Sequence, residues 1–317
     1  MNLALVASSA SKKLKWAAVA LVLLNCRSFP LSWTVRVWLS VLKYFVRSWL
    51  FKFTLLFRSA SRVEIMKRER HTSISRLGRN PFNATTSYAS WAGLDDCDYN
   101  LHLSNSSYPK ILDMARMKAA LEHFPMFLRA GGVMVLAGTQ FDFIREIPIL
   151  SRYEIRANIA SWDEKRLYLI ARFVRLPTKK KVHDRDSKPS LVPQLPLKEP
   201  DGAVVHCVSI NQFVYKQGPI SVPPALALAC EGYSNLSPSG KPHTLDDPPP
   251  YWSHVKKIGD PKAIRKYMKS WKSVPEEERW WTTAFTGAVE DQRVANMALI
   301  EGVAKGVVGA RSIVAAY

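Results

Sequence analysis

The segment Asp96–Tyr108 gathers the side chains of this sequence that could do chemistry. It reads Asp-Cys-Asp-Tyr-Asn-Leu-His-Leu-Ser-Asn-Ser-Ser-Tyr, with acids, amides and a histidine within thirteen residues. The residues that follow carry apolar side chains at the spacing of one buried helical face, namely Ile111, Met114, Met117, Leu121 and Phe124. A polar loop is therefore expected to lead into a core helix.

The junction between loop and helix could stabilise developing negative charge. Ser106 or Ser107 can cap the helix, and Pro109 suits its first turn, where an N–H group has no intrahelical partner. Free N–H groups and the helix dipole would together polarise a carbonyl oxygen or hold an oxyanion. With Asp98 nearby as base or nucleophile, the arrangement suits attack on an ester or thioester carbonyl.

Two other interpretations of this segment bear on the prediction. Asp, Asn and Ser are ordinary turn and cap residues, so a purely structural role stays open at this point. The sequence has no His-x-x-x-His pair, and none of its four cysteines forms a Cys-x-x-Cys pair. We therefore expect neither a metal site nor a cofactor.

The spacing of five residues resembles a known family motif. Asp96, Asp98, His102, Asn105 and Tyr108 match the pattern of hotdog-fold acyl-CoA thioesterases of the 4-hydroxybenzoyl-CoA thioesterase type. The resemblance implies that Asp98 attacks the thioester or activates water, and that His102 and Asn105 complete the site. It also implies a homodimer, because hotdog subunits usually share active sites across a dimer interface.

A closer resemblance is to the membrane-anchored branch typified by thioesterase superfamily member 6. It rests on Asp96–Arg116 and on Trp162–Val174, within a region of similarity that covers about residues 90–220. The sequence departs from the wider family at Leu101, where many members have glycine, and at Ser104, where many have a second asparagine. Because glycine lets a backbone approach a ligand closely, Leu101 bears on how the substrate enters.

The downstream sequence predicts an α+β fold on its own. Tyr153, Ile155, Ala157 and Ile159 alternate with polar residues, as in a strand with one buried face. Asp163–Arg166 predicts a hairpin, and another strand is expected before Asp96. The other predicted strands are Leu167–Leu176, Val133–Phe143 and Val204–Tyr215. One long helix with several mostly antiparallel strands predicts a hotdog fold, an antiparallel sheet wrapped around a central helix.

The predicted hotdog domain spans residues 64–233 and contains a Pro-rich surface insertion at 177–201. After it, residues 234–317 form a Pro/Ser-rich linker and a helical extension, with helices expected over Pro261–Trp271 and Glu276–Ile313. The tryptophans of this tail are expected to anchor it to the domain rather than to bind a cofactor.

Residues 1–63 differ in composition from the rest of the chain. They hold ten Lys or Arg and no Asp or Glu, and thus supply +10 of the formal net charge of +19. The remainder carries only +9, so the charge does not favour a nucleic-acid partner. The basic excess fits an address or a membrane anchor instead.

No uncharged stretch of this segment reaches the roughly 20 residues that span a bilayer. Trp33–Phe57 instead predicts an interfacial helix, rich in aromatic and aliphatic residues and with basic residues on one stripe: Arg36, Lys43, Arg47 and Arg58. We expect N-terminal membrane-associated helices and an endomembrane location, the endoplasmic reticulum being favoured. A mitochondrial transit peptide is the alternative, because presequences are also basic and free of acids.

These observations predict a membrane-associated hotdog thioesterase with Asp98, His102 and Asn105 in its site. The substrate would be an acyl-CoA or an acyl-carrier thioester. The alternative is a non-catalytic acyl-binding or scaffold protein at a membrane, in which the motif survives as helix-capping structure.

Overall fold

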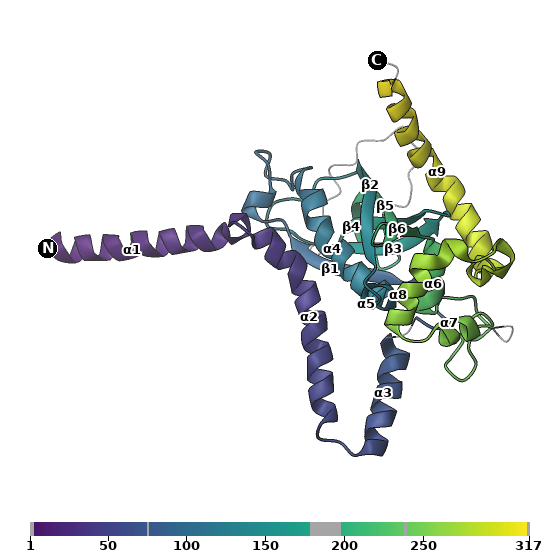
Figure 1. The fold of residues 1–317 in the computed structure, drawn as a ribbon. Coiled ribbons are helices and arrows are strands. Elements are labelled where there is room, and N and C mark those ends of the chain that lie inside the picture. Colours follow the sequence, from purple (N-terminus) through teal and green to yellow (C-terminus); the bar gives the residue numbers. More distant parts are fainter. Residues whose placement is uncertain (1–2, 75, 178–197, 238–239, 316–317) are drawn as a thin grey trace.

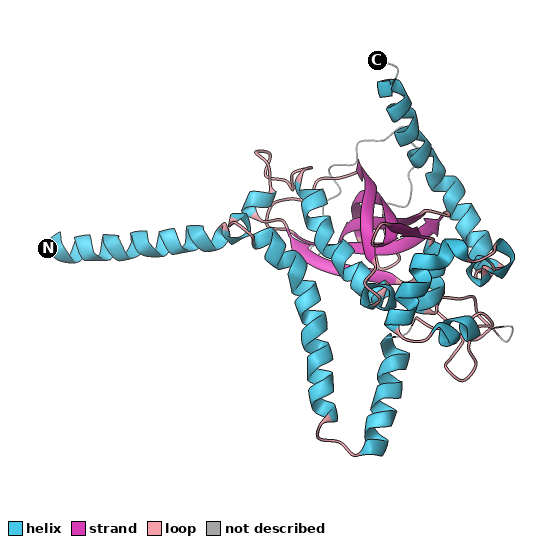
Figure 2. Cartoon of the chain, viewed as in Figure 1, coloured by secondary structure: helices cyan, strands magenta, loops and turns pink. Residues whose placement is uncertain are grey.

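A long helix lies against an antiparallel sheet in the computed structural model, which describes residues 3–74, 76–177, 198–237 and 240–315 (Figure 1). The strands are β1 (Thr85–Trp91), β2 (Val133–Phe143), β3 (Arg152–Trp162), β4 (Arg166–Arg175), β5 (Val204–Gln217) and β6 (Ile220–Val222). Their order is β1-β3-β4-β5-β2, with β6 paired to β5, and every pairing is antiparallel. The predicted α+β arrangement of sheet and helix is confirmed (Figure 2).

The strands form where the hydrophobic pattern places them. In β3, Tyr153, Ile155 and Ala157 are buried and alternate with partly exposed polar residues. Strand β4 lies between β3 and β5 and is buried on both faces for most of its length. The hairpin between β3 and β4 is confirmed, because Asp163 Oδ1 accepts hydrogen bonds from the backbone N–H groups of Lys165 and Arg166.

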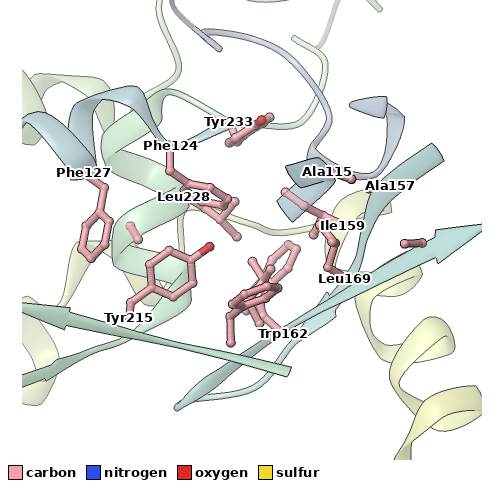
Figure 3. Packing of buried hydrophobic residues seen from close by; sticks show 14 of the residues in the cluster. Ala115, Phe124, Phe127, Ala157, Ile159, Trp162, Leu169, Tyr215, Leu228 and Tyr233 are labelled. Carbon is pink, nitrogen blue, oxygen red and sulfur yellow. The ribbon is translucent and has the colours of Figure 1, made fainter. Parts of the chain in front are cut away.

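The central helix α4 (Ser107–His123) is the helix for which the sequence predicts one buried face. Ile111, Met114 and Phe124 are fully or almost fully buried, as expected. Met117 and Leu121 are only partly buried, because they face the N-terminal helix α2 rather than the sheet. Beyond α4, the rings of Phe124, Phe127 and Tyr215 pack edge to face in the core (Figure 3).

Three helices form the N-terminal part: α1 (Leu3–Leu24), α2 (Ser32–Leu55) and α3 (Ala60–Ile74), with a 3-10 turn η1 (Cys26–Ser28). Helix α1 and the far ends of α2 and α3 project away from the sheet (Figure 1). Helix α3 runs across the expected domain boundary at residue 63. In the described part of the chain, no helix combines the length and the apolar character needed to cross a bilayer.

The C-terminal extension packs against the same core. Its helices are α7 (Trp252–Ile258), α8 (Pro261–Ser270) and α9 (Ala288–Ala315), and its 3-10 turns are η4 (Trp271–Ser273), η5 (Glu276–Glu278) and η6 (Trp280–Thr282). The preceding domain also contains the short helices α5 (Pro125–Arg129) and α6 (Pro224–Glu231), and the 3-10 turns η2 (Pro81–Asn83) and η3 (Leu94–Asp96) on either side of β1 in the chain. Helix α9 is tied to β3, because Asn296 Nδ2 donates to the carbonyl of Ala160 over 2.7 Å.

Two predictions for the extension have different outcomes. The helix expected from Pro261 is α8, whereas the helix expected from Glu276 begins only at Ala288 and the earlier prediction is wrong. The reason is Trp281, which is 2% exposed: burying this ring holds the chain in short 3-10 turns. Most of the predicted insertion, including Lys179–Lys181, lies outside the described residues.

Candidate active site

The loop from Asp96 to Ser106 is folded tightly around Asp98. The Oδ1 atom of Asp98 accepts the backbone N–H groups of Asn100, at 2.9 Å, and of His102, at 3.4 Å. The main chain closes the turn, since the Leu101 N–H donates to the carbonyl of Asp98 over 3.0 Å. Asp98 is half-buried, and it forms no salt bridge with any described residue. One of its carboxylate oxygens thus shapes the loop while the other remains for chemistry.

Leu101 adopts the backbone conformation that glycine favours. Its φ is +61°, in the left-handed region, and its side chain is 60% exposed. A left-handed L-residue costs roughly 1–2 kcal/mol. The turn therefore holds the residue before His102 in a conformation that glycine would adopt without this cost. Leu101 keeps the loop shape at a cost in stability.

His102 contacts Glu146, a residue that no local sequence pattern indicates. Its Nε2 lies 3.2 Å from Oε2 of Glu146, in the connection between β2 and β3. The same connection binds the loop through its backbone, because Leu103 N–H donates to the carbonyl of Ile147 and Ile149 N–H donates to that of Leu101, both over 2.8 Å. We call residues 144–150 the strap, since their backbone is hydrogen-bonded to the loop.

His206 on β5 secures the strap in turn. Its Nδ1 lies 2.9 Å from the carbonyl oxygen of Glu146, and the Ile144 and Arg145 N–H groups both donate to the carbonyl of His206. Burial lowers the pKa of His206 to about 4. The imidazole is thus neutral near pH 7, with Nδ1–H as the donor to Glu146.

The first acid of the motif has a structural role. Asp96 is completely buried, and its Oδ2 lies 2.9 Å from Nη1 of Arg27, in the N-terminal turn η1. The same Nη1 donates to the carbonyl of Trp91 over 2.7 Å, and the guanidinium lies 4.2 Å above the Trp91 ring. Lys110 Nζ is 3.6 Å from the other carboxylate oxygen. An arginine from the N-terminal segment therefore neutralises a buried acid at the base of the loop.

The start of α4 differs from the predicted cap. Neither Ser106 nor Ser107 caps the helix with its side chain; Ser106 Oγ lies instead 2.9 Å from Ser104 Oγ. The Ser107 N–H is taken up by the carbonyl of Ser104 at 2.8 Å, and Pro109 has no N–H. Among the first-turn groups, the N–H of Tyr108 thus remains without a hydrogen-bond acceptor in the described residues.

Tyr108, the fifth motif residue, forms an aromatic wall behind this helix start. It is 2% exposed and packs against the rings of Phe143 and Phe173, at centroid distances of 5.0 and 4.7 Å. Burial raises the pKa of its phenol, so the hydroxyl stays protonated. Asn105, by contrast, lies exposed on the turn before α4, and its side chain forms no hydrogen bond to any residue that the structure describes.

The remaining chemistry near the loop is limited. Burial, with the charges of Asp96 and Asp98, raises the pKa of the Cys97 thiol and so disfavours a thiolate nucleophile. Across the described ranges, no group of three or more His, Cys, Asp or Glu side chains could hold a metal ion. The arrangement that remains is a carboxylate, a histidine and a helix N–H around one loop, which suits base-assisted attack on an acyl group.

Comparison with known proteins identifies the class of this domain. A family model described as the thioesterase-like superfamily matches residues 92–227, which include the loop, α4 and strands β2–β6. The fold and the site resemble those of hotdog thioesterases. Residues 92–227 match the thioesterase-like superfamily, and the resemblance read from the Asp-x-Asp motif is confirmed.

Individual relatives agree with this class. The probable thioesterase atnL of Emericella nidulans is 29% identical over 154 residues, 42% of this chain and 49% of that protein. Protein THEM6 of Danio rerio is 34% identical over 84 residues, 26% of this chain and 41% of that protein. The chain thus spans about half or less of these curated relatives. The predicted enzyme class, a thioester hydrolase, agrees with the relatives that are named as thioesterases.

Among solved structures, the YbaW probable thioesterase of Escherichia coli aligns with 46% of this chain and 95% of its own, at 13% identity and a TM-score of 0.35.

Proposed function

We propose that this protein hydrolyses an acyl thioester with Asp98 as the general base. The observation that carries the proposal is the half-buried carboxylate of Asp98, which is fixed by two backbone N–H groups through one oxygen and forms no salt bridge with a described residue. A base held in this way keeps its orientation without losing its second oxygen to a counter-ion. The substrate would be carried by coenzyme A or by an acyl-carrier protein.

In the proposed reaction, Asp98 takes a proton from a water molecule while the oxygen of that water attacks the acyl carbon. The new C–O bond gives a tetrahedral oxyanion, which the Tyr108 N–H at the start of α4 would stabilise. The C–S bond then breaks, and the proton held by Asp98 passes to the departing thiolate. The products are a carboxylic acid and a free thiol.

The other predicted residues would act around this step. His102, paired with Glu146, holds the loop against the strap and is a positioning residue in this proposal. Asn105 is exposed beside the helix start, where it is available to the carrier part of the substrate.

We also propose that the protein forms a homodimer through β2. This strand is eleven residues long, lies at one edge of the sheet, and exposes apolar side chains that include Val133, Val135, Leu136 and Phe143. An open apolar edge of this length favours pairing with a second strand. A twofold pairing of β2 would join two sheets.

The N-terminal helices support membrane association. Helix α2 exposes large apolar side chains that include Trp38, Phe45, Trp49 and Phe53. The cations Lys43 and Arg47 are also exposed on this helix, so it could meet acyl chains and anionic head groups together. An endoplasmic reticulum location is proposed on this basis, and fractionation of cells against mitochondrial markers would separate it from the mitochondrial alternative.

The test of the enzymatic proposal is thioester hydrolysis by the full chain. A panel of short to long acyl-CoA and acyl-carrier thioesters would be offered to the parent and to Asp98→Asn. Asparagine retains the oxygen that accepts the two turn N–H groups but cannot act as a base. We expect kcat to fall by roughly 10²–10⁴-fold, the range typical of a lost general base.

The matched control is Asp163→Asn. Asp163 forms the same kind of turn in the β3–β4 hairpin, where its Oδ1 also accepts two backbone N–H groups. Turnover that collapses in Asp98→Asn and persists in Asp163→Asn would support the proposal. No turnover by folded parent, or equal turnover in both variants, would overturn it and favour an acyl-binding or scaffold role.

A further inference from the structure

A cavity of about 870 Å³ lies between the N-terminal helices and the domain. Helices α2 and α3 bound it on one side, and α4 and α5 bound it on the other. Most of its wall is apolar and includes Val41, Phe45 and Leu55 of α2, with Met117 and Leu121 of α4. The volume falls within the range of small-molecule sites, roughly 300–1,000 Å³.

One charged residue interrupts the apolar stripe of α2 that faces this cavity. The residues of the stripe recur at intervals of three or four, as one helical face requires: Trp38, Val41, Phe45, Ser48, Lys52 and Leu55. At 3.6 residues per turn, Lys52 lies on the opposite side of the helix from the basic stripe that contains Lys43 and Arg47. The charge of Lys52 is therefore directed at the cavity and not at the outer surface of α2.

A second lysine, Lys67 of α3, lines the same cavity. The packing of the two helices places it near Lys52. Arg70 Nη2 donates to Ser48 Oγ at 3.1 Å, and the Arg70 guanidinium lies 4.1 Å from the centroid of the Phe51 ring. Helices α2 and α3 run in opposite directions (Figure 1). Lys67, about one turn before Arg70, therefore lies beside the next turn of α2, which contains Lys52.

The described lining of the cavity supplies no acid to balance these lysines. Two arginines, Arg70 and Arg129, also line it, and none of the described residues around it is acidic. Arg129 is engaged by Tyr44, whose hydroxyl accepts from Nη2 over 2.7 Å. Lys52 and Lys67 form no salt bridge with any residue that the structure describes. Because like charges on facing helices repel, an anion between the two lysines would stabilise the packing of α2 on α3.

We propose that the cavity binds one anionic phospholipid of the membrane. The phosphate lies between Lys52 and Lys67, and an acyl chain lies along the apolar wall formed by α2 and α4. The ammonium group of lysine is a common partner of phosphate, and an apolar wall favours an alkyl chain because its burial removes apolar surface from water. This site rests on the membrane association proposed above and is independent of hydrolysis at the Asp98 loop.

Charge complementarity selects this occupant over others. A neutral acyl chain would leave both lysines without an anion, and phosphatidylcholine carries its own cation beside the phosphate. An acidic peptide would meet the lysines but would not fill an apolar cavity with alkyl chain. Helix α2 exposes Trp49 and Phe53 outside the cavity, where they would meet the bilayer that supplies the lipid.

The test is native mass spectrometry of the full chain, released from phosphatidylcholine nanodiscs that contain a minor fraction of phosphatidylserine. We expect one phosphatidylserine molecule to remain bound to each chain. The double variant Lys52→Gln, Lys67→Gln should lose this lipid. Val41→Trp should also lose it, because the larger side chain fills the cavity while both lysines stay in place.

The matched control is the double variant Lys43→Gln, Arg62→Gln. It removes one exposed cation from each of the same two helices, so its net charge equals that of the lysine variant, but neither residue lines the cavity. This control should retain phosphatidylserine like the parent. Asp98→Asn should retain it as well, which separates the lipid site from the enzymatic proposal. Circular dichroism and denaturant unfolding would verify that each variant is folded.

Each outcome supports or overturns the site. Loss of phosphatidylserine only in the lysine and Val41 variants would support it. A parent that floats with vesicles but retains no phosphatidylserine would overturn the site and leave membrane association intact. Equal loss in the two double variants would assign the binding to general charge attraction, and equal retention of phosphatidylcholine would overturn the requirement for an anionic lipid.

Discussion

Replacing Arg27 should destabilise the protein through Asp96, a residue 69 positions away in the sequence. The Asp96 side chain is completely buried, and the Arg27 side chain is 14% exposed, so the pair is shielded from water. Removal of one partner of a buried ion pair costs about 3–5 kcal/mol, because the other charge stays buried without compensation. We therefore expect Arg27→Ala to lower the free energy of unfolding by this order.

Two contacts determine where in this range of about 3–5 kcal/mol the loss of unfolding free energy should fall. Lys110 Nζ stays 3.6 Å from Asp96 and would compensate in part, although its side chain is 36% exposed. The contact of Arg27 with the Trp91 ring would be lost as well, which adds about 0.5–2 kcal/mol. Since the two effects oppose each other, the middle of the range, about 4 kcal/mol, is expected.

A double-mutant cycle measures this directly. Denaturant unfolding of the full chain would be compared for the parent, Arg27→Ala, Asp96→Asn and the double variant. If the buried charge causes the loss, Asp96→Asn should be much less harmful in the Arg27→Ala background than in the parent. The control is Arg58→Ala, which removes an exposed arginine near the α2–α3 turn and should change stability little.

If the losses in unfolding free energy of Arg27→Ala and Asp96→Asn simply add in the double variant, the ion pair does not cause the loss. The same conclusion would follow if Arg27→Ala were as stable as Arg58→Ala. The same logic applies to a chain that lacks residues 1–63. That chain loses Arg27, so Asp96→Asn should improve its stability, and any hydrolysis assay on it would be difficult to interpret without that substitution.

Three further predictions concern the loop, the strap and the sheet edge. Leu101→Gly should raise the free energy of unfolding by about 0.5–1 kcal/mol, because relief of the left-handed conformation exceeds the added chain entropy; a less stable variant would contradict this. The lowered pKa of His206 gives stability that is present above pH 6.5 and lost as the pH falls towards 4, so acidification from pH 7 to 5 should cost about 2 kcal/mol through this group. In denaturant unfolding at both pH values, His206→Gln should reduce the loss by that amount, and an unchanged loss would exclude His206 as its source. Val135→Lys should produce monomers in sedimentation velocity while Val135→Thr does not, because a lysine on an edge strand opposes pairing; dimers in both would exclude β2 as the interface.

The regular elements were predictable because their patterns are local. Each pattern involves residues that are close together in the sequence: the alternation in β3, the hairpin residue Asp163 and the apolar spacing of α4. The loop motif was also found from spacing alone. What the spacing could not reveal was which acid is buried, and the structure assigns that position to Asp96.

Pairings between distant residues were beyond the sequence. Arg27 and Glu146 lie far from the loop in the chain, and no local pattern selects them from the other charged residues as partners of Asp96 and His102. The delayed start of α9 has a similar cause, since burial of Trp281 overrides the helical preference of the residues before Ala288.

The strap described above makes the loop part of a cooperative unit. The bonds from Leu103 to Ile147 and from Ile149 to Leu101 are supplemented by one from Leu150 N–H to the carbonyl of Ala92, at 2.8 Å. These bonds join the middle of the loop, and Ala92 before it, to one segment, so breaking one favours the loss of the others. The amides of the loop and of the strap should therefore exchange with solvent deuterium at a common rate, as a single local unfolding event.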